Sequence, residues 1–288
     1  MSPFDPPVTA IRDVVARSLA EDLTPLGDIS AALLPEGATA TAVLRSRAAG
    51  VVAGCACVTE VLDQVDRRLT VEWQLDDGDA VEPGGVVGVL NGPLAPMLTA
   101  ERTALNLLSH LSGIATLTRR FVDAAGPGIR VWDTRKTTPG LRALEKAAVR
   151  AGGGANHRGN LSEWVMLKDN HLELISVAEA VTQARAWFPA RTIHVECDTR
   201  DKVTEALDAD VDALLLDNMT PAEARACVAL VDEHATATGR RRPVVEISGG
   251  ITLETVRTYA EVGADLVSSG SLTNSAPVLD IGLDIRVS

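Results

Sequence analysis

The first third of the chain combines helical and strand-like patterns of apolar residues. Four apolar residues at helical spacing, Ile11, Val14, Val15 and Leu19, predict a helix over residues 8–20. Apolar and polar residues alternate over 39–45, 69–75 and 86–90, with Gly, Asp and Pro between these stretches, which predicts strands joined by turns. Leucines at helical spacing predict a long helix over 95–113. This order indicates a mixed α/β sandwich domain over 1–112.

From residue 129 a short apolar run, a polar loop and a helix-length amphipathic segment alternate. Strands are predicted at 129–132, 164–167, 192–195, 213–216, 244–247 and 266–268, with helices at 141–150, 177–188, 200–206, 221–233 and 253–262. Such alternation predicts a parallel sheet covered by helices. Six units are too few for a closed eight-stranded barrel, so we expect an incomplete, open α/β barrel over 113–274. A doubly wound sheet is the alternative, although no Gly-x-Gly-x-x-Gly motif follows the first strand. The tail, 275–288, is expected to pack on the sandwich domain.

Charge restricts the classes of partner. The chain has 27 Lys and Arg against 39 Asp and Glu, a net charge of −12, which argues against a nucleic-acid partner or an anionic membrane surface. No apolar run approaches the ~18 residues of a membrane span, and the first residues lack the features of a secretion signal. We therefore expect a cytoplasmic protein in which any anionic ligand occupies a local positive pocket.

Polar residues follow every predicted strand of the second domain. These strand ends are 133–137, 168–171, 196–198, 217–218, 248–250 and 269–271. Each could be a solvated loop. However, carboxyl ends of parallel strands meet at one edge, where barrels build their sites, and these ends separate into basic, acidic and glycine-containing groups. Together they predict one active site.

The basic group is suited to an anionic ligand. Arg135, Lys136, Arg158 and Lys168 could bind several anionic groups, since arginine binds a carboxylate through two hydrogen bonds and lysine is a compact charge. Residues 133–170 contain seven Lys and Arg against four Asp and Glu, a net charge of +3. This stretch is the local positive pocket that the overall charge requires.

The acidic and glycine-containing groups are suited to a metal ion and a phosphate. Glu196 and Asp217 end neighbouring strands and could hold Mg²⁺ through water and substrate oxygens, or could be ordinary acidic caps. The segments Ser248-Gly249-Gly250 and Ser269-Gly270-Ser271 could bind a phosphate monoester through exposed amides, or form tight turns.

Two further basic segments have more than one interpretation. His157 and Arg158 follow three glycines, 152–154, which suits either a helix stop with a flexible connection or a mobile anion-binding loop. Arg102 lies on the long helix before the barrel, where a surface position is the simpler interpretation. The residues alone therefore indicate a magnesium-assisted enzyme that acts on a phosphorylated, polyanionic substrate.

Most of the chain resembles the quinolinate phosphoribosyltransferase family. The matching segments, in the order of the family, are Glu21–Leu23 with Gly27–Asp28, Ala100–Asn106, His110–Thr116, Asp133–Gly140, Gly152–Arg158, Lys168–His171, Leu216–Asn218, Ser248–Ile251 and Leu279–Ile281. The resemblance implies transfer of phosphoribose from phosphoribosyl pyrophosphate to quinolinate with loss of CO₂, giving nicotinate mononucleotide and pyrophosphate. It also implies an amino-terminal sandwich on an open α/β barrel, and a homodimer with shared active sites.

The resemblance implies roles for particular residues. Arg135, His157, Arg158 and Lys168, with Arg102 of the partner subunit, would surround the two quinolinate carboxylates. Lys136, Glu196 and Asp217 would serve the sugar, the pyrophosphate and Mg²⁺, making Lys136, Lys168, Glu196 and Asp217 the expected catalytic residues. Thr134 would contact substrate, and residues 248–250 with 269–271 would bind the 5′-phosphate.

Two alternatives to this activity remain. A homologue that belongs to molybdenum uptake shares the fold, but the complete set of arginines disfavours it. A non-catalytic anion-binding protein would not need Glu196 and Asp217 beside Arg135 and Lys136. One position departs from some members of the family: residue 274 is Asn where certain members have a basic or another polar residue. A contribution of charge at position 274 is therefore in doubt, but the activity class is not.

Overall fold

The computed structural model describes residues 4–287, which divide into two compact units. The first contains the chain through Arg119, then Lys136–Gly154 and the segment from Leu272 on; the second contains Arg120–Arg135 and Ala155–Ser271. The first unit thus includes residues 136–154, which the sequence placed with the barrel. A domain boundary near residue 113 stays a prediction.

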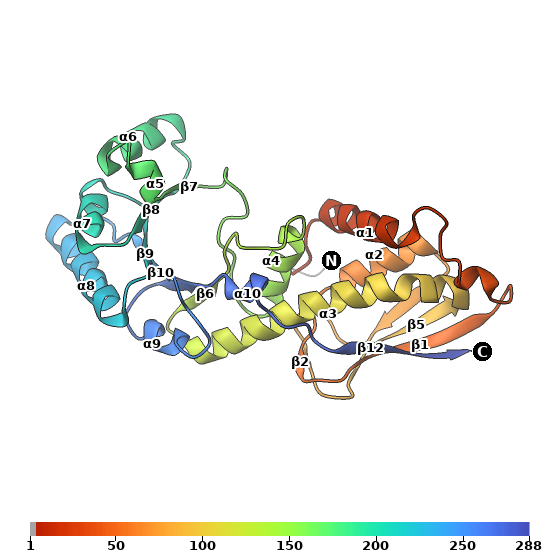
Figure 1. Cartoon of the computed structure of the whole chain (residues 1–288). Coiled ribbons are helices and arrows are strands. Elements are labelled where there is room, and N and C mark those ends of the chain that lie inside the picture. Colours follow the sequence, from red (N-terminus) through yellow and green to blue (C-terminus); the bar gives the residue numbers. More distant parts are fainter. Residues whose placement is uncertain (1–3, 288) are drawn as a thin grey trace. The chain divides into compact units, whose positions relative to one another are not determined.

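The first unit is built on an antiparallel sheet with the strand order β12-β1-β5-β3. Its strands are β1 (Thr39–Ser46), β3 (Thr70–Trp73), β5 (Val86–Pro93) and β12 (Ile281–Val287), and a separate pair joins β2 (Gly50–Val51) to β4 (Ala80–Val81). Figure 1 shows β12, from the end of the chain, beside β1. The carboxyl-terminal tail therefore supplies an edge strand of this sheet.

Helices provide the remaining core of the first unit. They are α1 (Val8–Leu23), α2 (Cys55–Val65), the first part of α3 (Leu94–Ala125) and α4 (Arg142–Ala151), with a 3₁₀ turn, η1 (Ala31–Leu33). The predicted apolar stripe of α1 is buried, and so are Cys57, Val58, Val61 and Leu62 on one side of α2.

Helix α3 is longer than the sequence predicted, because it continues through Gly113 to Ala125. A Cβ atom on Gly113 would lie 2.1 Å from the carbonyl oxygen of Pro277. The glycine therefore allows the tail to approach the helix and does not end it.

The second unit is an incomplete, open α/β barrel, as predicted. Its six parallel strands are β6 (Arg130–Trp132), β7 (Val165–Leu167), β8 (Ile193–Cys197), β9 (Ala213–Asp217), β10 (Val244–Ser248) and β11 (Leu266–Ser268). Their order is β6-β11-β10-β9-β8-β7, so each strand from β7 to β11 is added on the same side of the one before it. A doubly wound sheet would reverse direction, which excludes that alternative. The sheet is open because its end strands, β6 and β7, do not pair with each other.

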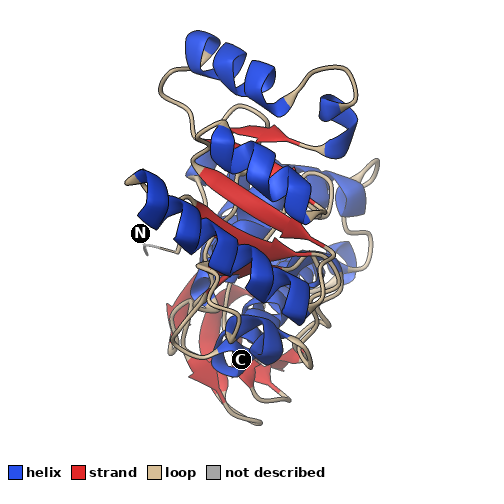
Figure 2. Ribbon diagram, turned by 90° about the vertical axis from the view of Figure 1, so that its left-hand side faces the viewer, coloured by secondary structure: helices blue, strands red, loops and turns tan. Residues whose placement is uncertain are grey.

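Helices cover the parallel strands of the barrel, and Figure 2 shows them alongside the strands. They are α5 (Asp169–Leu172), α6 (Val177–Trp187), α7 (Arg200–Asp208), α8 (Pro221–Thr238) and α9 (Val256–Ala260). Helix α10 (Ser271–Asn274) begins at the last residue of this unit, and its other residues belong to the first unit. Side chains of Ser176, Thr199 and Thr220 cap α6, α7 and α8, respectively, by accepting a backbone N–H from the first turn. Within residues 4–287, no helix has both the length and the apolar composition that crossing a bilayer requires.

Candidate active site

Alternation along the barrel strands places polar side chains on one face of the sheet. In β8, Ile193, Val195 and Cys197 are buried on one side, while His194 and Glu196 lie on the other. In β10, Glu246 and Ser248 follow the same alternation. Polar side chains from several strands therefore converge in the barrel interior and at its carboxyl edge.

Two arginines form the basic part of this edge. Arg158 is 6% exposed, and both its burial and the charge of Arg135 lower the pKa of its guanidinium, against a smaller opposite effect of Glu163. Within the described chain, the Nε atoms of Arg135 and Arg158 are buried and have no hydrogen-bond partner. Buried donors without acceptors are costly, so this pair of cations is suited to an anion.

His157 is held in place by the end of β6. Its backbone N–H donates to Asp133 Oδ1 at 2.8 Å, and the side chain of Asn156 donates to Asp133 Oδ2 at 2.7 Å. A parallel bridge joins Ala155 to Trp132. The segment after the three glycines is therefore bonded to the first barrel strand, which positions His157 and Arg158 at the strand ends.

Glu246, fully buried in β10, contacts the His157 ring from the other side. Glu246 Oε2 lies 3.2 Å from His157 Nε2 and 3.5 Å from His194 Nε2, and Oε1 accepts the Ser268 hydroxyl. Burial alone would raise the pKa of Glu246, but the hydrogen bond from His157 and the charges of His194 and His157 outweigh it, so the pKa is lowered. For His194 burial dominates and lowers the pKa, although Glu246 opposes this effect.

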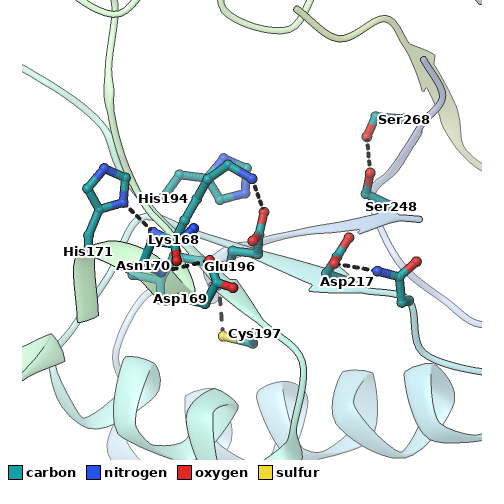
Figure 3. A network of polar contacts seen from close by, with 12 residues as sticks. Lys168, Asp169, Asn170, His171, His194, Glu196, Cys197, Asp217, Ser248 and Ser268 are labelled. Atoms are coloured by element: carbon teal, nitrogen blue, oxygen red, sulfur yellow. Dashed lines mark hydrogen bonds and ion pairs between the residues drawn. The ribbon is translucent and has the colours of Figure 1, made fainter. Parts of the chain in front are cut away.

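Lys168 and Glu196 lie at the ends of the paired strands β7 and β8 and form an ion pair (Figure 3). The Lys168 backbone N–H also donates to His171 Nδ1 at 3.0 Å, which fixes the start of α5. The Glu196 side chain is largely buried, whereas that of Lys168 is 42% exposed. The structure therefore brings one predicted basic residue into contact with one predicted acidic residue.

Asp217 and the glycines after β10 occupy two interlocked turns. Asn218 has a φ of 56° and donates its side-chain amide to Asp217 Oδ2 at 2.6 Å (Figure 3). Gly249 has a φ of 89°, and a Cβ there would lie 2.3 Å from Asn218 Oδ1. Only glycine fits this approach, so the turn of Ser248, Gly249 and Gly250 lies against the turn that carries Asp217.

The serines at and after the end of β11 already make hydrogen bonds within the protein. Ser269 is buried and donates its hydroxyl to the carbonyl of Ile251 at 2.9 Å, so the 2.7 Å contact between Ser269 and Ser271 uses the Ser271 proton. Ser268 Oγ lies 3.1 Å from Ser248 Oγ and thereby links β11 to β10 (Figure 3). This network orders the two segments that the sequence suggests for phosphate binding, with Gly270 between the serines.

The remaining candidates are divided between the two units. Thr134 follows β6 in the barrel unit and is half-buried. Lys136 and Arg102 belong to the first unit and are exposed, with Arg102 on α3. The Lys136 carbonyl accepts the Thr273 hydroxyl at 2.8 Å. The neighbouring Asn274 ends α10 and is exposed.

Sequence reasoning missed His194 and Glu246. Both are polar residues within otherwise apolar strands, in the runs Ile-His-Val-Glu-Cys and Val-Val-Glu-Ile-Ser. Alternation predicts that such residues share a face with Glu196 and Ser248, respectively. That signal was available and pointed to the barrel interior.

Comparisons with known proteins identify the family. Residues 28–112 match the amino-terminal domain of quinolinate phosphoribosyl transferase, and residues 114–284 match its carboxyl-terminal domain. The chain is 39% identical to the nicotinate-nucleotide pyrophosphorylase [carboxylating] of Mycobacterium leprae over 96% of this chain and 97% of that protein. It is 38% identical to the probable nicotinate-nucleotide pyrophosphorylase [carboxylating] of Bacillus subtilis, over 91% and 89%.

Solved structures agree with this assignment. The nicotinate-nucleotide pyrophosphorylase of Francisella tularensis superposes with a TM-score of 0.91 at 32% identity, and 99% of each chain is covered. That of Ehrlichia chaffeensis superposes with a TM-score of 0.88 at 35% identity, over 95% of this chain and 98% of the other. The chain therefore belongs to the quinolinate phosphoribosyltransferase family.

Proposed function

We propose that this chain transfers the phosphoribosyl group of phosphoribosyl pyrophosphate to the ring nitrogen of quinolinate, with loss of the 2-carboxylate as CO₂. The products are nicotinate mononucleotide, a precursor of NAD, and pyrophosphate. The relatives from M. leprae and B. subtilis carry the name of this activity. The observation in this chain that carries the proposal is the pair of arginines, Arg135 and Arg158, whose buried Nε donors lack acceptors within the described residues.

Quinolinate fits this basic part of the site because it carries two carboxylates. Arg135 and Arg158 can each bind a carboxylate through paired hydrogen bonds, and the His157 ring is positioned beside them by Asp133 and Glu246. Lys168 adds a positive charge at the end of β7. In the proposed homodimer, Arg102 of the partner subunit completes the set. A substrate with one carboxylate would leave part of this charge unpaired.

Phosphoribosyl pyrophosphate fits the acidic and glycine-containing part. Glu196 and Asp217 offer carboxylate oxygens on the adjacent strands β8 and β9, the donor type that Mg²⁺ prefers, and would hold the ion directly or through water. When bound, Mg²⁺ supplies charge neutralisation to the leaving pyrophosphate. Lys136 would serve the sugar and the pyrophosphate, with Thr134 next to it in sequence. The backbone of 248–250 and 269–271 would bind the 5′-phosphate.

The chain's own residues can support both chemical steps. In the first, the C1–oxygen bond to pyrophosphate breaks and the bond from C1 to the quinolinate nitrogen forms. The carboxylates of Glu196 and Asp217 stabilise the positive charge that develops on C1. In the second, the bond from ring C2 to the carboxylate breaks, CO₂ leaves and C2 takes up a proton. The ammonium of Lys168, held by Glu196, can neutralise the carbanion. Positioning of two polyanions supplies much of the rate.

Two further assignments belong to this proposal. The active form is a homodimer in which each subunit contributes Arg102 to its partner, and the protein acts in the cytoplasm. An exposed arginine on α3 is compatible with the first. The molybdenum-uptake and non-catalytic alternatives are not favoured by the family match.

Purified protein is expected to form nicotinate mononucleotide from quinolinate and phosphoribosyl pyrophosphate in the presence of Mg²⁺. Product should disappear after chelation with EDTA and return when Mg²⁺ is added. Chromatography with mass detection measures both organic products. Nicotinate offered in place of quinolinate serves as the matched control. Turnover of nicotinate without turnover of quinolinate would overturn the substrate assignment.

Replacing Glu246 with glutamine is expected to raise the Michaelis constants of both substrates by about tenfold, because a hydrogen bond to a charged group contributes roughly 1.5–3 kcal/mol. The variant weakens the contact with His157 on the quinolinate side and the link through Ser268 to Ser248 on the phosphate side. Steady-state kinetics with each substrate varied in turn measures the change. Glu223→Gln, at the exposed start of α8, is the control. Michaelis constants that stay within twofold of the wild type would contradict the positioning role.

A further inference from the structure

Three buried metal-ligating side chains meet inside the barrel, below the strand ends. His157, His194 and Glu246 are 7%, 3% and 0% exposed, respectively, and they come from the segment after α4, from β8 and from β10. Each of the three residues offers one ligand atom that lies within 4.8 Å of the ligand atoms of the other two. This group differs from Glu196 and Asp217, which offer only oxygen.

The distances from Glu246 to the two histidines suit a tetrahedral metal ion. Ligands bound to zinc at about 2.0–2.2 Å in a tetrahedron lie roughly 3.3–3.6 Å from one another. The two distances from Glu246 Oε2 to the histidine nitrogens are 3.2 and 3.5 Å. We propose that His157, His194 and Glu246 form a binding site for a divalent transition-metal ion, for which Zn²⁺ is the best fit.

Hydrogen bonds to neighbouring groups orient two of the three ligands, His194 and Glu246. His194 makes a hydrogen bond with the backbone of Leu214, and because its Nε2 faces Glu246, this bond uses Nδ1 and leaves Nε2 for the metal. Glu246 accepts the Ser268 hydroxyl through Oε1, so Oε2 faces the histidines. Ligating histidines and carboxylates in metal sites are oriented by such contacts. The cluster therefore has both the donor set and the outer contacts of a zinc site.

A cavity of about 480 Å³ reaches the cluster at His194. Its lining includes His194, Trp132 and Trp164, together with residues at the amino-terminal ends of the strands such as Thr192 and Val244. It therefore opens on the barrel end opposite to the candidate active site. The cavity can hold water or a small anion as the fourth zinc ligand, and its arginines favour an anion, although Arg185 is paired with Asp212 at 2.9 Å.

The site is selective because imidazole nitrogen is a poor ligand for Mg²⁺ and a good ligand for Zn²⁺ and Co²⁺. The three-ligand set with an open fourth position matches zinc sites of two histidines and one glutamate. Mg²⁺ bound at Glu196 and Asp217 would leave the cluster unchanged, so the two ions can be distinguished in one sample.

The test measures metal bound to the whole protein after treatment with EDTA and desalting. Wild-type protein incubated with ZnCl₂ and excess MgCl₂ is expected to retain one Zn²⁺ per chain through gel filtration, as measured by elemental analysis. His194→Gln should lower zinc affinity at least about 100-fold, whereas His234→Gln, on α8 outside the cluster, should retain the ion. Wild-type protein that retains no zinc, or His194→Gln that binds it equally well, would overturn the proposal.

Cobalt gives a second measurement that does not depend on a variant. Wild-type protein with CoCl₂ is expected to show the intense visible absorption of four-coordinate Co²⁺, with two imidazole nitrogens among the ligands. Circular dichroism checks the folding of His194→Gln, and if that variant does not fold, the cobalt spectrum decides. The weak absorption of six-coordinate Co²⁺ would mean that the ion binds elsewhere and that the cluster is only a buried network of histidines and a carboxylate.

Discussion

Replacing Arg158 with alanine is expected to lower kcat/KM for quinolinate by about 10²–10³, because truncating one partner of a buried charge pair costs roughly 2–5 kcal/mol. The arginine is 6% exposed beside Arg135, and its Nε donor has no acceptor within the described chain. In the proposed complex a quinolinate carboxylate is that acceptor. Initial rates at varied quinolinate concentration measure the loss.

Two comparison variants separate charge from geometry at this position. Arg158→Lys keeps the charge but loses the paired hydrogen bonds, so it should recover only part of the activity. Arg257→Ala, on α9, removes an exposed arginine paired only with Glu261 at 3.6 Å and should leave kcat/KM unchanged. An Arg158→Ala enzyme within threefold of the wild type would contradict the assignment of Arg158 to quinolinate.

Mixing two inactive variants is expected to restore activity if subunits share active sites. Arg102→Ala and Lys136→Ala should each be nearly inactive, since one removes a quinolinate contact from the partner's site and the other a pyrophosphate contact from its own. After subunit exchange at equal concentrations, half of the dimers are mixed, and each contains one intact site. The expected activity is therefore about a quarter of the wild type.

A second mixture provides the control for this experiment. Lys136→Ala and Lys168→Ala both alter a subunit's own site, so a mixed dimer of these two has no intact site and should remain inactive. Size-exclusion chromatography confirms that both mixtures are dimeric. Equal activity in the two mixtures, or none in either, would show that Arg102 does not act in the partner's site.

Much of the fold could be predicted from local sequence patterns. The barrel strands were found because each is a short apolar run between polar loops, and the structure keeps these runs as β6 to β11 with ends shifted by one or two residues. Helix α2 was not predicted, although its buried residues, Cys57, Val58, Val61 and Leu62, follow helical spacing. Its three valines favour a strand locally, and packing in the folded chain outweighs this preference.

Contacts between distant segments explain the other differences in the fold. Gly113 resembles the end of a helix, but a Cβ there would collide with Pro277, more than 160 residues later in the chain. Likewise β12 pairs with β1 across more than 230 residues, and a pattern at the end of the chain does not identify that partner. The local periodicity of apolar residues does not predict these contacts between distant segments.

The candidate site was predictable where residues follow strands and less so where they lie within them. Lys168, Glu196 and Asp217 are polar residues at strand ends, and topology brings such ends to one edge. His194 and Glu246 lie within apolar runs that predict strands, and the folded strands place both side chains on the interior face. The sequence also suggested Ser269 as a phosphate ligand, but only the structure shows that its hydroxyl is already donated to Ile251.

The fate of the quinolinate 2-carboxylate tests the central claim most directly. Quinolinate labelled with ¹³C at that carboxylate is incubated with phosphoribosyl pyrophosphate, Mg²⁺ and the purified protein, and released ¹³CO₂ and nicotinate mononucleotide are both quantified. The proposed function predicts one ¹³CO₂ for each nicotinate mononucleotide and no label in the nucleotide. A labelled nucleotide, or no nucleotide from quinolinate under conditions where another base is converted, would contradict it.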